Sequence, residues 1–257
     1  MNIHPTAIID PEARLAEDVS VGAYAVIGAD VEIGSGCQVA DHATIYGPTT
    51  IGTDNQILQH VTLGGAPQDL HYKGEPTQLV IGDRNIIREY VSFSRGSVGG
   101  GGITRIGDDN FIMAYAHIGH DCQVGSKNII TNSVSLAGHV EVGDQCNLGG
   151  FSLIHQFVRI GSHAFTSMGS AINRDVPPYV TVSGNYARSY GINKIGLQRK
   201  GFSAEAIAAI QKAYKLLVRR RVQREDALEQ LEPLAQEFSE VRLFVDFVQS
   251  TARGIVK

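Results

Sequence analysis

The stretch VSVGAYAVIGADVEIGSGCQVADHATIYGPTTIGTDNQILQHVTL, residues 19–63, carries an aliphatic side chain at every sixth position. A repeat of six matches neither the 3.6-residue period of an amphipathic helix nor the two-residue alternation of a strand. It predicts a solenoid, in which short structural units stack one upon the next.

The aliphatic series extends beyond this stretch in both directions. It starts at Ile3, is interrupted twice between Leu63 and Ile106, and then continues to Ile172, with Thr166 as the one polar member of that last part. Three hexads form one triangular coil of about 18 residues, and successive coils stack as parallel strands roughly 4.8 Å apart. We therefore predict an all-β parallel β-helix of about ten triangular coils.

Small residues recur four positions after many of the aliphatic ones, at the phase that points into a narrow prism. Cys37, Cys122 and Cys146 all occupy this phase. Their spacing fits no zinc-ligand pattern, and an interior position favours buried free thiols over a disulfide or a nucleophile.

The repeat is broken by two excursions and then ends. Residues at about 65–80 and 94–105 lose the aliphatic pattern, and we expect them to leave the prism as loops, where binding groups are often placed. Pro177 and Pro178 end the series, because proline cannot donate the hydrogen bond of a paired strand.

The remainder of the chain has a helical pattern. Ser203 and Ser239 each precede apolar residues at helical spacing and are candidate helix N-caps. We therefore assign residues 1–185 to the β-helix and residues 186–257 to a small α-helical C-terminal domain.

The composition excludes several classes of protein. A formal net charge of −4 argues against a general nucleic-acid binder. The first residues contain no basic segment followed by an apolar core, and no apolar run is long enough for a transmembrane segment. We expect a soluble protein of the cytoplasm.

Residues one coil apart lie above one another, so relative positions in space follow from residue numbers. By this arithmetic His120, Gly138 and Gln156 share one phase, and Asp121 and His139 share the next. Side chains from successive coils therefore converge on one edge of the prism over about 10 Å of height.

Two chemistries are open to this histidine cluster, which His117 and His155 adjoin. Facing histidines can ligate zinc, as in hexapeptide-repeat carbonic anhydrases, or one histidine can act as a general base oriented by a carboxylate. Asp121 supplies a carboxylate beside His120, and an oxyanion can approach the backbone N–H of Gly138 because no side chain intervenes. Base and oxyanion donor together fit acyl transfer better than metal hydration.

Longer motifs along essentially the whole chain carry a family resemblance. They are PQDL (67–70), HIGHDC (117–122), LAGHV (136–140), IHQF (154–157), DVPPYV (175–180) and GFS (201–203). With these motifs the chain closely resembles the bacterial UDP-N-acetylglucosamine O-acyltransferases. The resemblance implies left-handed winding, an acyl donor carried on the phosphopantetheine of acyl carrier protein, no other cofactor and no metal. It also implies a homotrimer, with active sites between neighbouring prisms, that carries out the first step of lipid A synthesis.

The resemblance implies a role for each residue of the matching motifs. His120 would take the proton from the glucosamine 3-hydroxyl as it attacks the thioester, Asp121 would orient His120, and the Gly138 N–H would stabilise the oxyanion. Gln68 and Asp69 would hold the sugar from across the subunit boundary. The residues that would contact the sugar, the acyl chain, the nucleotide or its phosphates are Gln68, Asp69, His117, His139, His155, Gln156, Asn193 and Arg199.

One local basic patch lies on the helix expected after Ser203. Its members are Lys212, Lys215, Arg219, Arg220 and Arg221. A solvated helix face is the plain interpretation, whereas the resemblance makes the patch a docking surface for acyl carrier protein.

Met168 falls where the resemblance places the end of the acyl groove. Bulk at the floor of a groove excludes longer ligands by overlap, so we predict a preference for a medium 3-hydroxyacyl chain of roughly ten carbons. The alternative is that Met168 packs in the interior.

Three positions depart from the family pattern. His71 stands where many members have lysine, Ser94 where histidine is common, and NKIG (193–196) lacks an acidic residue. Because of these changes, the acyl acceptor could instead be the 3-amino analogue of UDP-N-acetylglucosamine, and the product would then be an amide.

Two other classes of protein are alternatives. One is a related enzyme: an N-acyltransferase would lack the PQDL loop, and a carbonic anhydrase would bind zinc stoichiometrically. The other is a non-catalytic scaffold, which leaves the alignment of His120, Gly138, His139 and His155 unexplained.

Overall fold

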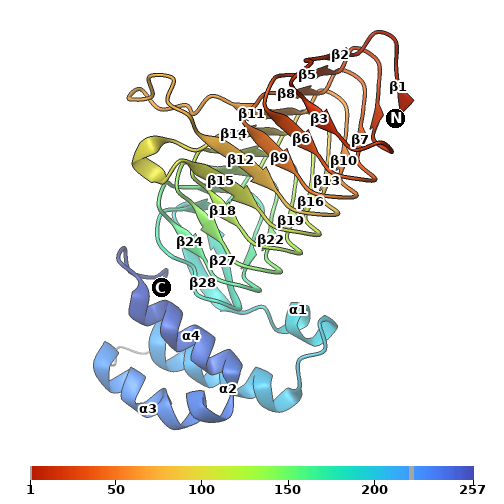
Figure 1. Ribbon diagram of the computed structural model, residues 1–257. Helices are drawn as coiled ribbons and strands as arrows, with labels where there is room; N and C mark the ends of the chain where they lie inside the picture. The colour runs from red at the N-terminus through yellow and green to blue at the C-terminus, as the bar shows by residue number, and fades with distance from the viewer. Residues whose placement is uncertain (1, 220–222) are drawn as a thin grey trace.

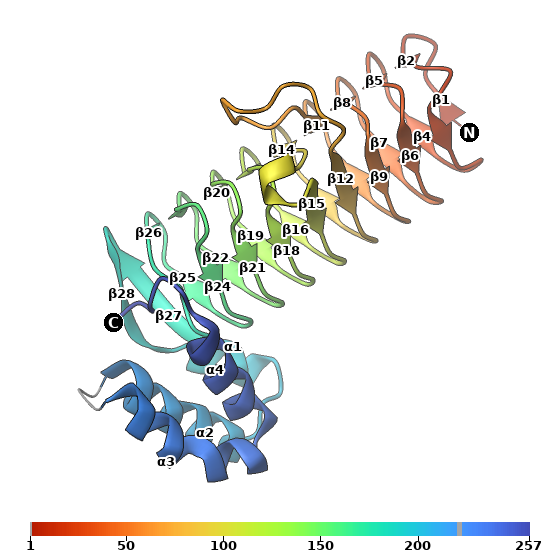
Figure 2. The ribbon, with the colours of Figure 1, turned by 60° about the vertical axis from the view of Figure 1, so that its left-hand side comes forward.

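The computed structural model describes residues 2–219 and 223–257. The chain winds into a left-handed parallel β-helix that is followed by a small group of helices, as Figures 1 and 2 show. Short strands form three sheets, one on each side of a triangular prism, and this confirms the predicted fold class.

The three sheets are named A, B and C, and their strands are given in spatial order. Sheet A contains β1 (Asn2–Ile3), β4 (Ser20–Val21), β7 (Gln38–Val39), β10 (Gln56–Ile57), β13 (Ile86–Ile87), β16 (Phe111–Ile112), β19 (Ile129–Ile130), β22 (Asn147–Leu148), β25 (Phe165–Thr166), β27 (Val180–Gly184) and β28 (Ala187–Ile192). Sheet B contains β2 (Ile8–Ile9), β5 (Val26–Ile27), β8 (Thr44–Ile45), β11 (Thr62–Gly65), β14 (Ser92–Ser94), β17 (His117–Ile118), β20 (Ser135–Leu136), β23 (Leu153–Ile154) and β26 (Ala171–Ile172). Sheet C contains β3 (Arg14–Leu15), β6 (Val31–Ile33), β9 (Thr49–Ile51), β12 (Gln78–Ile81), β15 (Ile103–Ile106), β18 (Gln123–Val124), β21 (Glu141–Val142) and β24 (Arg159–Ile160).

The aliphatic residues of the hexads form the core. Ile118 pairs with Leu136 on the next coil, and Leu136 pairs with Ile154 above it, so identical phases stack as predicted. All three side chains are buried. Burial of such a stack supplies the main stabilisation, because each fully buried aliphatic side chain contributes about 1.5–3 kcal/mol.

The cysteines belong to the same interior. Cys37, Cys122 and Cys146 are buried and free, which confirms the prediction. Burial raises the pKa of the Cys122 and Cys146 thiols to about 12, so neither is a ready nucleophile at neutral pH.

Each corner of the prism is named by the two sheets that it joins. The corner residues adopt the left-handed conformation: Tyr90 at the A–B corner, Asp121 and His139 at the B–C corner, and Asp54 and Arg84 at the C–A corner. Because the corner positions repeat with the coil, a side chain at one corner lies next to the side chain at the same corner of the next coil.

Both excursions leave the prism at the B–C corner. The first joins β11 to β12 through residues 66–77, and the second joins β14 to β15 through η1 (Val98–Gly100). Figure 2 shows the two excursions on the same side of the prism. They therefore lie along the same edge as the stacked histidines.

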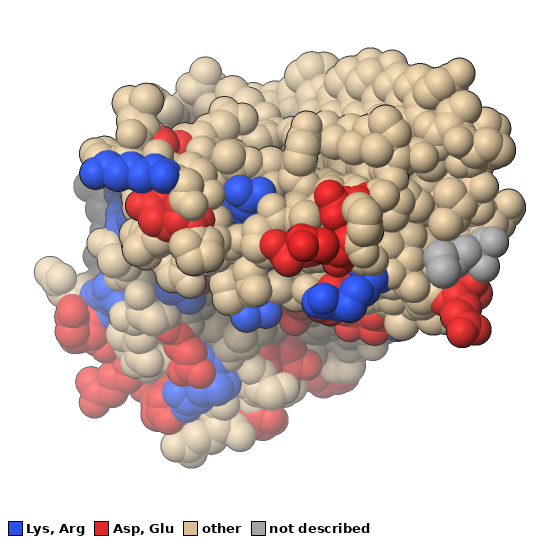
Figure 3. All heavy atoms as spheres, turned by 45° about the horizontal axis from the view of Figure 1, so that its top comes forward, with Lys and Arg blue, Asp and Glu red and all other residues tan. Residues whose placement is uncertain are grey.

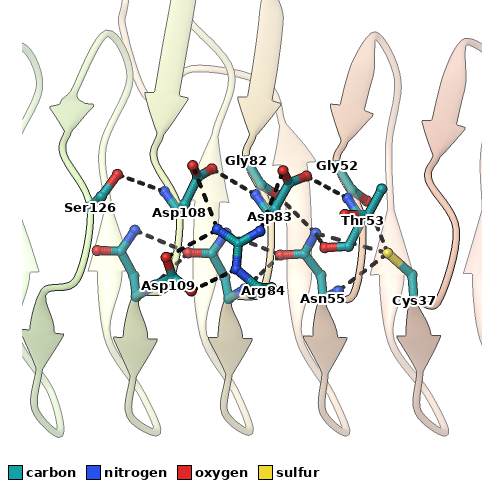
Figure 4. A network of polar contacts seen from close by, with 12 residues as sticks. Cys37, Gly52, Thr53, Asn55, Gly82, Asp83, Arg84, Asp108, Asp109 and Ser126 are labelled. Carbon is teal, nitrogen blue, oxygen red and sulfur yellow. Dashed lines mark hydrogen bonds and ion pairs between the residues drawn. The ribbon is translucent and has the colours of Figure 1, made fainter.

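The C–A corner carries a polar ladder, which Figure 4 shows. The Thr53 N–H donates to Asp83 Oδ1 at 2.7 Å, the Asp83 N–H to Asp108 Oδ1 at 2.8 Å, and the Asp108 N–H to Ser126 Oγ at 2.9 Å. Arg84 contacts the ladder residues Asp83 and Asp108 and also Asp109, whose Oδ1 lies 2.8 Å from its Nε. Side chains of one coil thus satisfy the corner N–H groups of the coil below.

Inside the prism a second ladder consists of buried asparagines. The side-chain oxygen of Asn55 accepts from the backbone N–H of Asn85, and Asn85 does the same for Asn110, both at 2.9 Å. Each of these side-chain oxygens thus accepts from the asparagine of the next coil, which lowers the cost of burying it, and the ladder ends at Asn128, whose buried Nδ2 has no hydrogen-bond partner in the described chain.

The C-terminal part comprises α1 (Lys194–Arg199), α2 (Ala204–Tyr214), the π-helical turn η2 (Lys215–Arg219), α3 (Arg224–Glu237) and α4 (Ser239–Ser250). Ser203 caps α2 by accepting from the Ala206 N–H at 3.1 Å, as predicted. Ser239 is the first helical residue of α4 and makes no cap, so that prediction was wrong; Phe238 holds the cap position. None of the described helices is long and apolar enough to cross a membrane.

One segment in the range assigned to helix is instead a strand. Residues 187–192 form β28, which pairs antiparallel with β27 and extends sheet A. Its alternation explains the difference, because Ala187 and Ser189 are buried whereas Arg188 and Tyr190 are exposed.

Candidate active site

His120 and Asp121 form a hydrogen-bonded pair at the B–C corner, between β17 and β18. His120 Nδ1 lies 2.7 Å from Asp121 Oδ2. The Asp121 side chain is 0% exposed, and its left-handed backbone (φ 61°) turns it toward the second excursion. A carboxylate accepts, so Nδ1 carries the imidazole proton and Nε2 keeps its lone pair.

The second excursion holds Asp121 in place. The Ser97 N–H donates to Asp121 Oδ1 at 2.8 Å, and the Ser97 hydroxyl donates to Oδ2 at 2.7 Å. The Asp121 N–H donates to Thr104 Oγ1 at 2.8 Å. A Cβ at Gly100 would lie 2.1 Å from the Asp121 carboxyl carbon, so glycine is required there. Sequence reasoning missed these contacts, although the glycine-rich run at 99–102 was a signal of close backbone approach.

Gly138 faces the free nitrogen of His120. A Cβ on Gly138 would lie 2.6 Å from His120 Cε1 and 2.7 Å from Nε2, so only glycine leaves the ring undisturbed. The Gly138 N–H donates to no backbone or side-chain acceptor within residues 2–219 and 223–257. A basic nitrogen and an unpaired backbone donor therefore lie side by side, as predicted from the stacking phase.

His139 adjoins the pair from the next coil. Its ring meets that of His120 edge to face at 5.0 Å and stacks on Phe157 at 4.3 Å. Burial lowers its pKa, and the charge of Asp121 raises it by a smaller amount. Phe157, which sequence reasoning missed, occupies the same phase one coil above His139.

The same residues form the one group in the described chain whose donor set could hold a metal ion. Ligand atoms of His120, Asp121 and His139 all lie within 4.8 Å of one another. Asp121 already accepts hydrogen bonds from Ser97 and His120, whereas His139 Nε2 is 3.8 Å from its Oδ2. Hydrogen bonding by itself accounts for this arrangement.

A groove of about 380 Å³ runs over the outer face of sheet B beside this corner. Its lining, which is mostly apolar, includes His117, Leu153, His155, Asn173 and Tyr186. Two of the predicted contact residues therefore share one groove, and Asn173 and Tyr186 were not predicted. Such a trough is suited to a hydrocarbon chain.

His117 is fixed at the floor of this groove. Its Nδ1 lies 2.8 Å from Ser92 Oγ, in the strand below. Burial lowers the pKa of His117, and the charge of His120 lowers it further. A neutral His117 can donate or accept a hydrogen bond without adding charge to the groove.

The first excursion brings a carboxylate toward the pair. The backbone N–H of His71 donates to Asp69 Oδ1 at 2.9 Å and is the main cause of the lowered Asp69 pKa, to which the charge of His120 also contributes. Asp69 is thus in electrostatic range of His120 in the same chain. Gln68 and His71 are exposed beside it.

Asn193 and Arg199 lie elsewhere. Asn193 caps α1, with its Oδ1 accepting from the Gly196 N–H at 3.2 Å and its Nδ2 donating to the His163 carbonyl at 3.3 Å. His163 belongs to the C–A corner, so one chain does not bring Asn193 to the B–C corner where His120 lies. Figure 1 shows α1 on the opposite side of the prism from the two excursions. Arg199 is exposed in the last turn of α1.

Two further predictions concern exposed residues. Met168 is 79% exposed at the turn between β25 and β26, so the alternative that it packs in the interior was wrong. It does not line the groove of its own chain. Of the basic patch, Lys212 lies on α2 and Lys215 and Arg219 on η2, whereas Arg220 and Arg221 lie outside the described residues.

Comparisons with known families match two parts of the chain. Residues 175–256 match the family described as UDP-N-acetylglucosamine O-acyltransferase, domain 2. Residues 103–138 match the family of the bacterial transferase hexapeptide with six repeats.

Curated relatives and solved structures match over the whole length. An acyl-(acyl-carrier-protein)-UDP-N-acetylglucosamine O-acyltransferase of Thiobacillus denitrificans is 53% identical over 99% of both chains. One of Ectopseudomonas mendocina is 56% identical over 100% of this chain and 99% of its own. The UDP-N-acetylglucosamine O-acyltransferase of Moraxella catarrhalis superposes with a TM-score of 0.98 at 42% identity, covering 100% of each chain. The UDP-N-acetylglucosamine acyltransferase of Francisella novicida gives a TM-score of 0.96 at 38% identity, covering 99% and 93%.

Proposed function

This chain belongs to the UDP-N-acetylglucosamine O-acyltransferase family and is an acyltransferase, and we propose that it moves a 3-hydroxyacyl group from acyl carrier protein to UDP-N-acetylglucosamine. The acceptor is the glucosamine 3-hydroxyl, and the reaction is the first step of lipid A synthesis in the cytoplasm. The observation that carries the proposal is the free Nε2 of His120 beside the unpaired N–H of Gly138.

The proposed mechanism is general-base catalysis without a metal. His120 Nε2 takes the proton of the 3-hydroxyl while its oxygen attacks the thioester carbon. The carbonyl oxygen becomes an oxyanion and accepts a hydrogen bond from the Gly138 N–H. The intermediate then expels the thiolate, which takes the proton from the His120 imidazolium. Asp121, bonded at 2.7 Å, stabilises that imidazolium and fixes the tautomer that can act as base.

Substrate contacts are proposed on both sides of this pair. Gln68 and Asp69 bind the sugar from the first excursion, and His139 and Gln156 border the same space. The acyl chain occupies the groove over sheet B, where His117 and His155 lie. Mostly apolar walls support this assignment, because a hydrocarbon chain gains about 0.8 kcal/mol per buried methylene.

The assembly is proposed to be a homotrimer in which a second copy completes each site. Asn193 and Arg199 would bind the nucleotide or its phosphates in the site of a neighbour, because they lie beside the C–A corner of their own chain. Light scattering should therefore give three times the 27.6 kDa of one chain. A monomer mass would contradict this part of the proposal.

The outer faces support such an assembly. Figure 3 shows a broad surface without Lys, Arg, Asp or Glu along the upper part of the prism. The outward residues of sheet B are Ile8, Val26, Thr44, Thr62, Ser92, His117, Ser135, Leu153 and Ala171. At the adjoining A–B corner a column of stacked rings consists of Tyr24, His42, His60, Tyr90 and Tyr115. Uncharged, aromatic surface of this kind is typical of contacts between subunits.

Chain length and carrier docking follow from the same assembly. Met168 is exposed in a single chain, so it limits the acyl chain to roughly ten carbons only where a neighbouring copy closes the groove over it. Lys212, Lys215 and Arg219, with Arg220 and Arg221, are proposed to dock the acidic carrier protein. Lys215→Glu should therefore raise KM for the carrier substrate and leave kcat unchanged.

The test is acyl transfer by the purified protein from a series of 3-hydroxyacyl carrier proteins. UDP-N-acetylglucosamine and its 3-amino analogue are offered in parallel. Product from the hydroxyl sugar with an optimum near ten carbons is the expected result, and Met168→Gly should shift the optimum to longer chains. Product from the amino sugar alone would overturn the acceptor, and no product from either would overturn the function.

A further inference from the structure

The C-terminal segment, residues 251–257, folds back from α4 onto the last coils of the β-helix. Asp175, which is 1% exposed, anchors it: the Thr251 hydroxyl donates to Asp175 Oδ2 at 2.5 Å, and the Val256 N–H donates to the Asp175 carbonyl at 2.9 Å. Ile255 and Val256 are buried. The segment therefore has a fixed place on the β-helix.

This anchoring brings Arg253 to the acyl groove. Arg253 Nη1 lies 3.2 Å from Nδ1 of His155 and also contacts the carbonyl oxygen of Gln156. His155 Nδ1 is itself 3.0 Å from that carbonyl. One guanidinium thus bridges two neighbouring atoms that belong to the site, from almost a hundred residues away in the sequence.

The contact decides which nitrogen of His155 carries the proton. Without Arg253, the favourable arrangement is an Nδ1–H that donates to the Gln156 carbonyl. A guanidinium only donates, so with Arg253 in place Nδ1 must accept and the proton must be on Nε2. The carbonyl loses nothing, because Arg253 donates to it as well.

We propose that Arg253 is a positioning residue, which acts through His155. It holds the His155 ring in one orientation and in the Nε2–H tautomer, so that the ring offers a hydrogen-bond donor to an oxygen of the acyl donor bound in the groove. This inference rests on the proposed function for the identity of the ligand, but the tautomer itself does not depend on it.

Kinetics of matched variants test the first part. Arg253→Met keeps the side-chain length and removes both donors, and kcat/KM for the acyl donor should fall about tenfold, mainly through KM, since one oriented hydrogen bond is lost. Lys257→Met removes a cation from the same segment without contact to His155 and should stay within twofold of the wild type. Arg253→Lys, which can still donate to Nδ1, should lie between the two.

A double variant separates positioning from an independent contribution. If Arg253 acts through His155, His155→Ala combined with Arg253→Met should be no slower than His155→Ala alone. Multiplying losses would overturn the proposal, and so would an Arg253→Met enzyme with unchanged kcat/KM.

The tautomer is read directly from proton–nitrogen correlation spectra of protein labelled with 15N-histidine, with His155 assigned by its absence in His155→Gln. The wild type should show the Nε2–H form, and Arg253→Met should shift His155 toward Nδ1–H. The same tautomer in both proteins would overturn the proposal. If the wild type transferred no acyl group at all, the proposed function would fail, and these spectra would still decide the role of Arg253.

Discussion

At two corners of the prism, residues at equivalent backbone positions differ in their hydrogen bonding. At the C–A corner Thr53, Asp83 and Asp108 stand two residues after a hexad aliphatic, and at the B–C corner His120 and Gly138 stand at that same position. In the ladder, each N–H donates to a side chain of the next coil at 2.7–2.9 Å. At the B–C corner the Gly138 N–H has no such partner in the described chain.

The ladder shows what the open position can bind. The Thr53 N–H and the Asp83 N–H each hold a carboxylate oxygen, which is an anionic oxygen of the kind that forms when a thioester is attacked. At Gly138 the side chain from the next coil is Gln156, which makes no hydrogen bond to it within the described residues. N–H groups at this position can therefore bind an anionic oxygen, and the B–C corner, where we propose that the reaction takes place, leaves such a group free beside His120 Nε2.

The largest expected effect comes from the carboxylate that orients the base. In Asp121→Asn the Ser97 N–H keeps the amide oxygen at the Oδ1 position, so the NH2 group faces His120 Nδ1 and donates to it. The ring then adopts the other tautomer, and Nε2 no longer accepts a proton. kcat should fall on the order of a thousandfold. Asp108→Asn, the same change in the ladder, is the control and should leave kcat within twofold; equal losses in both would break the comparison.

The second-largest effect is expected from a side chain that accepts a hydrogen bond from the Gly138 N–H. Gln156→Asp should create the same contact at the B–C corner, because the Gly138 N–H would donate to its carboxylate as the Thr53 N–H donates to Asp83. kcat should then fall about a hundredfold, with stability unchanged or higher. Gln156→Ala removes the same amide without filling the N–H and should be clearly more active. If Gln156→Asp were as active as Gln156→Ala, the proposed role of the Gly138 N–H in stabilising the oxyanion would be wrong.

The third change affects the ladder side alone. Asn85→Ala removes a buried side chain whose oxygen accepts from both the N–H and the side chain of Asn110. Leaving buried donors unpaired costs about 1–3 kcal/mol in the free energy of unfolding. Urea unfolding should show this loss while kcat at 25 °C stays that of the wild type. A fall in kcat with unchanged stability would contradict the division between the corners.

The smallest effect is a pH dependence at the C–A corner. Burial lowers the pKa of His163 from 6.5 to about 4. Between these values the unfolded chain binds more protons than the folded one, so stability is present at neutral pH and is lost as pH falls from about 6.5 toward 4. His163→Phe should reduce the drop in the urea midpoint between pH 7 and pH 5. An identical drop in both proteins would show that His163 is not its source.

The periodic features were predictable from the sequence because coil length turns residue numbers into positions. The stacking of His120 under Gly138, and of Asp121 under His139, follows from a spacing of 18 residues, and the structure has them together. The interior position of Cys122 follows in the same way.

The remaining parts of the site depend on segments that have no period. Ser97 reaches Asp121 from an excursion that shifts the register, so that Ile81 pairs with Ile106 instead of a residue 18 positions away. Arg253 reaches His155 only because α4 and Asp175 direct the last residues back to the prism. Neither contact can be predicted from the six-residue repeat, since each depends on the conformation of a segment outside it.

The most direct test of the account is the activity and the folded state of His120→Ala, measured on one preparation. Acyl transfer to UDP-N-acetylglucosamine gives kcat, and light scattering with thermal unfolding reports assembly and Tm. We expect kcat to be lower by about a thousandfold, with the oligomer and Tm as in the wild type. A variant that keeps its kcat within threefold would contradict the assignment of His120 as the general base. It would also contradict the central claim that His120 and Gly138 at the B–C corner form the active site.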